Sequence, residues 1–362
     1  MIKNSLEKIT ILKTASLVEA LKKMDIEGVK LLIVVENGLF YGLISIGDIQ
    51  RAIINNKPFS IEIQNIIRSN IFVASAGDDP EEIKQDMLLR KIEFMPVVND
   101  RKEIVDVLFW EDLFKDSPLP SHYEKINLPV VIMAGGRGER LKPLTNVIPK
   151  PLIPLGEKPI IDEIIESFQR NGCNKFYISV NYMSDMIRDH FLKKGNYENI
   201  EFIQENKPLG TAGSLFYLKG KISSTFFVNN CDVLIKQNYA EIYNYHRESR
   251  NEITIVASLK STKVPYGLVE TEENGRITGI TEKPYVNYMV NTGLYLLEPH
   301  LLDELKEGEP LNITSLIEGI LARRGRAGSF PISEDSWFDI GEIGDYWKLI
   351  NSVRVKQKGH EY

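Results

Sequence analysis

The segment from residue 130 to residue 154, VVIMAGGRGERLKPLTNVIPKPLIP, constrains the fold more than any other stretch of the chain. Its apolar start predicts a buried strand, and Ala134, Gly135 and Gly136 predict a tight turn at the end of that strand. Because glycine has no Cβ, the backbone N–H groups of such a turn can close on phosphate oxygens. Arg140 and Lys150 add two cations, which suits a triphosphate, since its charge exceeds what N–H groups alone can balance.

The order of residues in this segment resembles the signature of the sugar-1-phosphate nucleotidyltransferases, G-G-x-G-x-R-L-x-P-L-T followed by P-K-P-L. A purely structural turn does not need this order of cations and prolines. The dinucleotide-binding fingerprint of the nicotinamide-dependent dehydrogenases fits less well, because Leu141 stands where its third glycine is needed. The positions that match the nucleotidyltransferase signature are Gly135, Gly136, Gly138, Arg140, Leu141, Pro143, Leu144, Thr145, Pro149, Lys150, Pro151 and Leu152.

Charge and cysteine content argue against several other classes of protein. The net charge of −6 and the lack of a basic stripe argue against a nucleic-acid partner. The two cysteines, Cys173 and Cys231, form neither a disulfide framework nor the spacing of a zinc site. The N-terminus has no apolar signal-peptide core, and no apolar stretch approaches the length of a membrane helix. We therefore expect a cytoplasmic protein without a membrane partner.

The first third of the chain reads as a duplicated α+β unit. Each copy predicts a short strand, an amphipathic helix and a β-hairpin, in that order. In the first copy, Ser16 and Glu19 have the spacing of a capping box, and Asn37-Gly38 marks the hairpin turn. The predicted elements are strands at 9–12 and 71–74, helices that begin near Leu17 and Pro80, and hairpins within 31–49 and 94–109.

This duplicated pattern resembles the tandem CBS pair, a module that often binds adenosine nucleotides between its repeats. In that family, a Thr or Ser and an Asp three residues later contact the ribose. Ser45 and Asp48 match in the first copy, whereas the second copy has Asp112 but Phe109 in place of the hydroxyl residue. The resemblance therefore implies one adenosine-nucleotide site, at Ser45 and Asp48. The alternative is that these residues only cap helix N-termini, where their residue types are common.

The rest of the chain predicts an α/β domain. Apolar runs alternate with amphipathic helices, which predicts a doubly wound, mainly parallel sheet, and the resemblance makes it a GT-A-like nucleotidyltransferase fold. The expected elements include helices over 159–172 and 185–195 and strands over 175–182 and 226–234. The expected domains are CBS repeats at 1–58 and 59–116, a linker at 117–127, the nucleotidyltransferase domain at 128–355 and a tail at 356–362.

Residues 205–214, ENKPLGTAGS, resemble the loop that faces the nucleotide base in this family. The resemblance implies that Glu205, Gly210 and Thr211 contact the nucleotide here, with Ala134 and the glycine turn on the phosphate side. An ionised carboxylate only accepts hydrogen bonds, and guanine offers adjacent N1–H and N2–H donors, so Glu205 favours GTP. Thymidylyl and uridylyl members usually carry glutamine at this position. The alternative is a solvated loop glutamate, because acidic side chains are mostly exposed.

Two aspartates far apart in the sequence resemble the metal ligands of the family. The resemblance implies that Asp232 and Asp339 hold the catalytic Mg²⁺, as an octahedral ion between phosphates requires. Taken singly, each aspartate also suits a turn or a cap. Cys231 replaces the usual glycine before the first aspartate, and a nucleophilic role for it would need a base partner. In the second motif, W-x-D-x-G-T-P-x-D-Y, the matching residues are Trp337, Asp339, Gly341, Asp345 and Tyr346, while Glu342 and Ile343 replace Thr-Pro.

Three further motifs resemble the sugar side of the family. Gly267, in PYGLV, is implied to let the backbone approach the hexose. Glu282 and Lys283 match E-K-P, in which the glutamate contacts sugar hydroxyls and the lysine binds the sugar phosphate. Asn291 begins the N-x-G turn that closes the pocket. The alternative for Glu282 and Lys283 is an exposed ion pair of little energetic weight.

Together, the motifs imply nucleotidyl transfer from GTP to a hexose 1-phosphate, with Arg140, Lys150 and Lys283 on the phosphates. A CBS pair ahead of this domain is similar to the glucosamine-1-phosphate guanylyltransferases of legionaminic acid synthesis, so glucosamine 1-phosphate is the first expectation for the acceptor. The motifs equally allow mannose 1-phosphate, and UTP or dTTP stays an alternative donor. An inactive, adenosine-sensing regulatory subunit is the alternative from another class, disfavoured by the retained cations and aspartates. We also expect a homo-oligomer.

Overall fold

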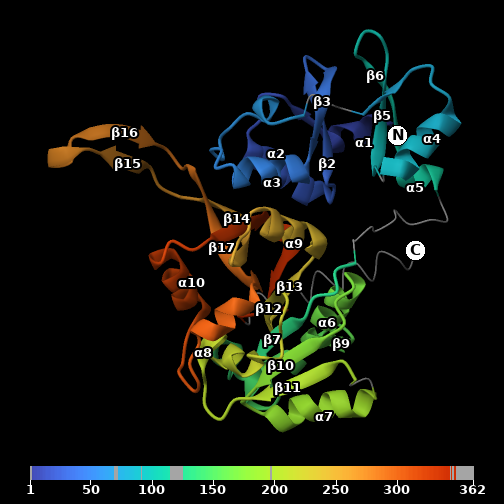
Figure 1. Ribbon diagram of the computed structural model, residues 1–362. Helices are drawn as coiled ribbons and strands as arrows, with labels where there is room; N and C mark the ends of the chain where they lie inside the picture. Colours follow the sequence, from blue (N-terminus) through green and yellow to red (C-terminus); the bar gives the residue numbers. More distant parts are fainter. Residues whose placement is uncertain are drawn as a thin grey trace. The chain divides into compact units, whose positions relative to one another are not determined.

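The computed structural model describes residues 2–68, 72–90, 92–114, 125–195, 198–342, 344, 346 and 347 (Figure 1). The chain forms two compact units, one of residues 1–122 with 259–288, the other of 123–258 with 289–362. Of the predicted linker only residues 125–127 are described, and the predicted tail lies outside the described residues. The domain boundaries proposed from the sequence therefore stay predictions.

The first unit contains two copies of one α+β pattern. In each copy, the first strand pairs in parallel with the second and the second pairs antiparallel with the third. The duplication predicted from the sequence is confirmed in this topology. The first copy comprises α1 (Ile2–Ile9), β1 (Thr10–Leu12), α2 (Leu17–Glu27), β2 (Leu31–Glu36), β3 (Leu39–Ser45) and α3 (Ile46–Ile54). The second comprises β4 (Ala74–Ser75), α4 (Pro80–Arg90), β5 (Phe94–Val98), β6 (Ile104–Phe109) and α5 (Trp110–Leu113).

Local sequence signals explain the first copy well. The Ser16 side chain accepts a hydrogen bond from the backbone N–H of Glu19, and the Glu19 carboxylate accepts one from the backbone N–H of Ser16, so the capping box is confirmed. Asn37 and Gly38 have φ of 52° and 81°, as a tight hairpin turn requires. Helix α1 was not predicted, because eight residues are too few to show a clear helical period.

The second unit is built on a seven-stranded sheet. Strand β10 pairs in parallel with β11 and β7, β7 pairs in parallel with β12, and β12 pairs antiparallel with β17. This arrangement confirms the mainly parallel sheet predicted from the sequence. The strand order is β11 (Ile200–Gln204), β10 (Phe176–Val180), β7 (Val130–Ala134), β12 (Phe226–Asn230), β17 (Tyr285–Leu297), β14 (Ile253–Lys263) and β18 (Ala327–Ile332).

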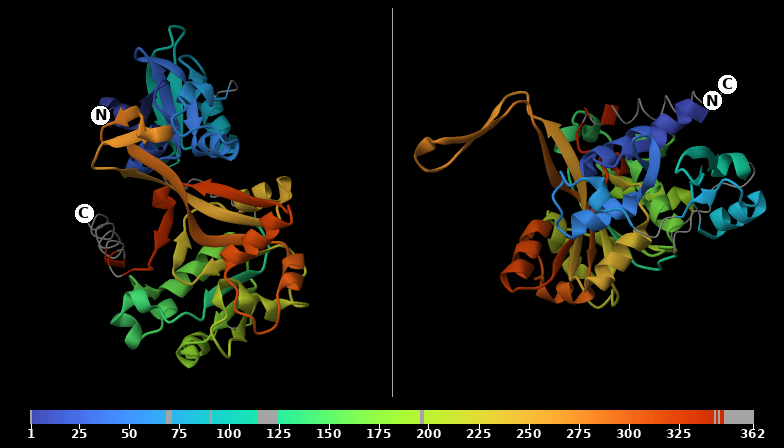
Figure 2. Two further views of the ribbon diagram at one scale, coloured as in Figure 1. Left: turned by 90° about the vertical axis from the view of Figure 1, so that its left-hand side faces the viewer. Right: turned by 90° about the horizontal axis from the view of Figure 1, so that it is seen from above.

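Helices cover both faces of this sheet, as the views in Figure 2 show. Side chains of β7 alternate between two hydrophobic cores: Val130 and Ile132 pack with α6 and α9, whereas Val131 and Met133 pack with α8 and α10. The sheet is therefore doubly wound. The helices are α6 (Ile160–Arg170), α7 (Ser184–Lys194), α8 (Gly210–Gly213), α9 (Tyr239–Glu248) and α10 (Ile313–Ala322). No helix in the described part of the chain is long and apolar enough to cross a membrane.

The single strand predicted over 226–234 is wrong, because the chain breaks at Cys231 and Asp232. Strand β12 ends at Asn230, and β13 (Val233–Ile235) pairs antiparallel with β19 (Trp337–Asp339) in a separate two-stranded sheet. The break falls in the polar part of FVNNCDV, where the chain leaves the main sheet. Because Val233 is the register partner of Asp339, the break brings the two predicted metal ligands to neighbouring strands.

Candidate active site

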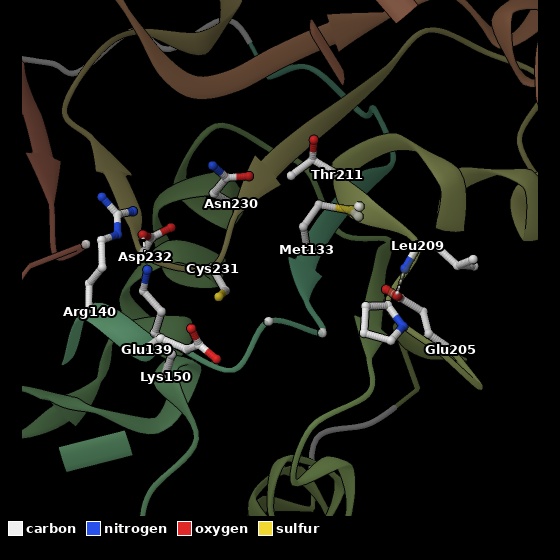
Figure 3. Close-up of a pocket in the computed structure, with 16 residues that line it drawn as sticks. Met133, Glu139, Arg140, Lys150, Glu205, Leu209, Thr211, Asn230, Cys231 and Asp232 are labelled. Atoms are coloured by element: carbon white, nitrogen blue, oxygen red, sulfur yellow. Dashed lines mark hydrogen bonds and ion pairs between the residues drawn. The ribbon is translucent and has the colours of Figure 1, made fainter. Parts of the chain in front are cut away.

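A pocket of about 510 Å³ lies at the carboxyl ends of β7 and β12. In parallel sheets, ligands bind beyond these strand ends. Most residues predicted for the nucleotide and the metal line this pocket, namely Gly135, Gly136, Gly138, Arg140, Lys150, Glu205, Gly210, Thr211 and Asp232. Ala134 is buried at the end of β7 and does not line it. Figure 3 shows Arg140, Lys150 and Asp232 on one side of the pocket, with Glu205, Leu209 and Thr211 on the other.

The glycine turn after β7 has two kinds of glycine. At Gly138, φ is 64° and an added Cβ would lie 2.8 Å from the Thr145 side chain, so the fold itself requires glycine there. At Gly136, an added Cβ would meet no atom within 4 Å. The backbone of Gly136 is thus open on the side of its missing side chain. Short 3₁₀ turns follow instead of an α-helix, at Glu139–Leu141, Leu144–Asn146 and Lys150–Leu152, which is unlike the dinucleotide-binding fingerprint.

Two cations occupy one wall of the pocket in different ways. The Lys150 ammonium is ion-paired with the Asp232 carboxylate, and both side chains are largely buried. Arg140 is mostly exposed, and its guanidinium lies 3.5 Å from the carboxylate of Glu342. An exposed pair at this distance is weak, so a phosphate can replace Glu342 on Arg140 at little cost. Lys150, by contrast, is held where Asp232 places it.

Asp232 and Asp339 lie near each other because β13, which begins directly after Asp232, pairs with β19, which ends at Asp339. The backbone N–H of Ile340 donates to the Asp232 carbonyl at 3.0 Å, and the N–H of Gly341 donates to Oδ1 of Asp339 at 2.7 Å. Burial raises the pKa of Asp339 above its ordinary value, and the negative charge of Asp232 raises it further. A carboxylate whose charged form is disfavoured by burial and by a neighbouring negative charge is a site that a cation relieves.

These two carboxylates fit a divalent cation that takes its other ligands from substrate and water. Among the described residues, no group of three or more His, Cys, Asp and Glu side chains could hold a metal ion by itself. Mg²⁺ is usually bound by one or two carboxylates plus phosphates and waters. Asp232 and Asp339 therefore provide the number and type of ligands that a protein usually offers to Mg²⁺.

Cys231 lines the same pocket but is not a suitable nucleophile. Burial, assisted by the charge of Asp232, raises the pKa of its thiol to about 12. The thiolate is the reactive form of cysteine, and it is almost absent at neutral pH with such a pKa. The raised pKa therefore disfavours a nucleophilic role for Cys231.

Glu205 is buried, with only 4% of its surface exposed, so the alternative of a solvated loop glutamate is wrong. Its carboxylate accepts a hydrogen bond from the Ser179 hydroxyl at 2.5 Å and another from the backbone N–H of Leu209 at 3.1 Å. Sequence reasoning missed Ser179 and Leu209. The signal for Ser179 was a single polar residue in the apolar strand FYISV.

The predicted sugar-side residues are divided between the two units. Gly267, Glu282 and Lys283 belong to the first unit, around the two-stranded ribbon of β15 (Leu268–Thr271) and β16 (Ile277–Thr281). The Glu282 and Lys283 side chains are exposed and lie 3.8 Å apart, as the ion-pair alternative expects. Neither these three residues nor Asn291 lines the pocket.

The predicted turn at Asn291 is wrong, because Asn291-Thr292-Gly293 lies inside strand β17. The Asn291 amide donates to the Tyr295 hydroxyl at 2.8 Å and accepts from the N–H of Gly293 at 3.0 Å. Gly293 has φ of 90°, and a Cβ there would lie 2.5 Å from the Asn230 amide. The N-x-G motif therefore gives close packing of β17 against the end of β12.

Ser45 and Asp48 form the capping box of α3, so their capping role is confirmed. The Ser45 hydroxyl donates to Asp48 at 2.6 Å, and Arg68 donates to the same carboxylate at 2.7 Å. Burial alone would raise the pKa of Asp48, but the hydrogen bonds from Ser45 and Arg68 outweigh it and hold this pKa below its ordinary value. In the second copy, Phe109 provides no side-chain cap for α5. A ribose contact at Ser45 and Asp48 stays a prediction.

Comparison with protein families agrees with both halves of this description. The nucleotidyl transferase family model matches residues 129–356, and the CBS domain model matches residues 3–55. Since the first match covers well over half of the chain, the protein belongs to the nucleotidyl transferase family. The family predicted from the sequence is thereby confirmed.

Individual proteins with similar sequences or structures are consistent with this family assignment. The chain is 34% identical over 228 residues to a mannose-1-phosphate guanyltransferase of Aspergillus oryzae, covering 60% of this chain and 62% of the relative. It is 33% identical over 241 residues to a mannose-1-phosphate guanylyltransferase catalytic subunit beta of Xenopus tropicalis, covering 63% and 66%. The match thus spans less than two thirds of these relatives. Among solved structures, HddC of Yersinia pseudotuberculosis is similar at a TM-score of 0.50 and 25% identity, covering 62% of this chain and 99% of HddC.

Proposed function

We propose that this protein transfers a guanylyl group from GTP to a hexose 1-phosphate and releases pyrophosphate. One observation carries this proposal: a single pocket combines the open glycine turn, Arg140 and Lys150 with the carboxylate of Asp232. A polyphosphate needs N–H donors and cations, and its transfer needs charge neutralisation close to the reacting phosphorus.

In this proposal, the chain's own groups position the reactants. The N–H groups from Gly135 to Gly138 and the guanidinium of Arg140 hold the triphosphate, and Lys150 neutralises charge beside Asp232. The attacking phosphate monoester is already an anion, so no general base has to remove a proton. The sugar-phosphate oxygen bonds to the α-phosphorus while the bond to pyrophosphate breaks. Catalysis then rests on positioning and electrostatics.

We propose Mg²⁺ as the cofactor, held by Asp232 and Asp339. When bound, it supplies charge neutralisation on the phosphate oxygens. The position of Asp232 and Asp339 on neighbouring strands supports this assignment. A thermal melt with and without MgCl₂ tests it independently of turnover: the metal should raise the melting temperature of the wild-type protein and leave that of Asp232→Asn unchanged. Equal shifts in both proteins would contradict the site.

The proposed identities of the nucleotide and of the sugar are supported by different observations. The carboxylate of Glu205 supports guanine, and the relatives named above are guanylyltransferases. Those relatives favour mannose 1-phosphate as the acceptor, whereas the joined CBS architecture favoured glucosamine 1-phosphate. Glu282 and Lys283 stay the proposed sugar-side residues. Asn291 is better explained as a packing residue of β17, because both ends of its amide have internal partners.

A matrix of pyrophosphate-release assays tests the proposed function. Each of GTP, ATP, UTP, CTP and dTTP is paired with mannose 1-phosphate, glucosamine 1-phosphate and glucose 1-phosphate. We expect release with GTP and one or more of these acceptors, and the preferred acceptor decides between mannose and glucosamine. Release with UTP or dTTP but not GTP would overturn the base assignment. No release with any pair would favour the inactive regulatory subunit.

We also propose that the CBS pair binds an adenosine nucleotide near Ser45 and Asp48. The family match over residues 3–55 supports this partner. Calorimetry with AMP, ADP and ATP tests it, with Asp48→Asn as the variant. Binding heat in the wild type that is lost in the variant supports the site, and no heat with any of the three nucleotides would refute it.

A further inference from the structure

Three separate features hold the Glu205 carboxylate in one place. Ser179, on β10, is fully buried and donates its hydroxyl to Oε1 at 2.5 Å. The backbone N–H of Leu209 donates to Oε2 at 3.1 Å. Gly135 makes room for the carboxylate, because a Cβ there would lie 2.8 Å from Oε1. Two strand ends and the pocket loop therefore converge on one side chain.

The backbone of Glu205 is fixed as firmly as its carboxylate. Its N–H donates to the carbonyl of Val180 at 2.9 Å, and its carbonyl accepts from the Asn181 amide at 2.6 Å. A side chain held at both ends has little freedom to turn away from the pocket that it lines. Its position is set before any ligand arrives.

The hydrogen bonds within the protein leave acceptor capacity on both oxygens. An ionised carboxylate offers about four lone-pair positions, and Ser179 and Leu209 each occupy one, on different oxygens. By this count, each oxygen keeps one lone-pair position for a further donor. Guanine presents two adjacent N–H donors, N1–H and N2–H, and inosine presents only the first.

We propose that Ser179 is a specificity-determining positioning residue, whose hydroxyl orients the Glu205 carboxylate to accept both N–H donors of guanine. This inference rests on the proposed guanylyl transfer and names what sets its base preference. Ser179 does not touch the nucleotide in this scheme; it acts through Glu205. If the hydroxyl is removed, Oε1 loses a partner and the carboxylate can rotate about its last bond. The bidentate geometry is then lost, although the acceptor itself is kept.

The competing explanation is that the Ser179–Glu205 hydrogen bond only anchors the loop that contains Leu209. The two explanations differ in one measurable quantity, the ratio of kcat/KM for GTP to kcat/KM for ITP. ITP lacks the 2-amino group, so this ratio isolates one hydrogen bond to the carboxylate. A loop anchor would change stability and turnover for both nucleotides alike.

The experiment compares Ser179→Ala with Ser167→Ala in the full-length protein. Ser167 is also a buried serine, with its hydroxyl 3.3 Å from the Tyr239 hydroxyl, but it lies on α6 and does not line the pocket. A hydrogen bond to a charged group is worth about tenfold in specificity, so we expect a wild-type GTP-to-ITP ratio of about ten. Ser179→Ala should lower it at least about threefold, and Ser167→Ala should leave it unchanged.

Each outcome has one meaning. A wild-type ratio in Ser179→Ala, in a protein that still prefers GTP, would overturn the inference and leave the proposed function intact. A wild type that turns over neither nucleotide would overturn the proposed function instead. If Ser179→Ala does not fold, Ser179→Cys keeps the volume with a weaker donor and should give an intermediate ratio. Calorimetric affinities for GDP and IDP provide the same comparison without turnover.

Discussion

Acidic side chains near the two ends of the seven-stranded sheet have pKa values that are shifted in opposite directions. At the pocket, Asp339 lies near a second carboxylate, and its pKa is raised by burial and by Asp232. At the other end, Glu252, just before β14, accepts from Arg323 at 3.0 Å and lies 2.9 Å from the ring of His300. Hydrogen bonding to Arg323 is the largest of the effects that lower its pKa, to about 2. The Glu252 carboxylate is held by cationic partners, whereas the pKa of Asp339 is raised by a neighbouring negative charge.

The largest effect expected from this comparison is on activity at the pocket end. Asp232→Asn removes one carboxylate of the proposed metal site and the ion pair of Lys150. We expect kcat/KM to fall at least about a hundredfold, as measured by pyrophosphate release. Glu252→Gln is the matched control, because it changes an acid of the same unit at the far end of the sheet and should keep wild-type kcat. A similar loss of activity in both variants would refute the division of roles.

The next effect is on stability at the far end. Glu252→Gln removes the charge that pairs with Arg323, and because this pair is partly exposed we expect a loss of about 1 kcal/mol in unfolding free energy at pH 7. A carboxylate with a lowered folded-state pKa contributes fully above its ordinary pKa of 4.5, and this contribution is lost as the pH falls through about 2. The difference between variant and wild type should therefore shrink below about pH 4.5. Denaturant titrations at pH 7 and pH 3 measure it, and a difference that grows in acid would contradict the assignment.

The smallest effect has the opposite sign. Asp339→Asn removes a half-buried carboxylate that is repelled by Asp232, so the metal-free variant should be more stable than the wild type by about 2 °C in melting temperature. The measurement is a thermal melt in chelator. Addition of MgCl₂ should reverse the order, because only the wild type keeps both ligands. A variant less stable than the wild type in chelator would show that Asp339 serves the fold.

Signals that are local in sequence predicted much of this molecule. The capping box at Ser16, the hairpin at Asn37-Gly38 and the glycine turn at Gly135 each act within a few residues, so the sequence alone was sufficient for them. The alternation of apolar runs and amphipathic helices likewise predicted the doubly wound sheet. The placement of Asp232 beside Asp339 followed only from the resemblance to a family.

Interactions between distant segments could not be predicted in the same way. The Ser179–Glu205 hydrogen bond joins residues that are 26 positions apart. No local sequence pattern around either residue indicates that the two are in contact. The break between β12 and β13 was missed because FFVNNCDVL shows the composition of one strand. The error at Asn291 has a related cause: a glycine with positive φ usually marks a turn, whereas Gly293 is needed for close packing within a strand.

The small sheet of β13 and β19 determines how the two acids are spaced. Asp232 directly precedes β13, and Asp339 is the last residue of β19, with cross-strand partners holding them side by side. These two strands pair with each other and not with the seven-stranded sheet, so the separation of the two acids is set within this small sheet.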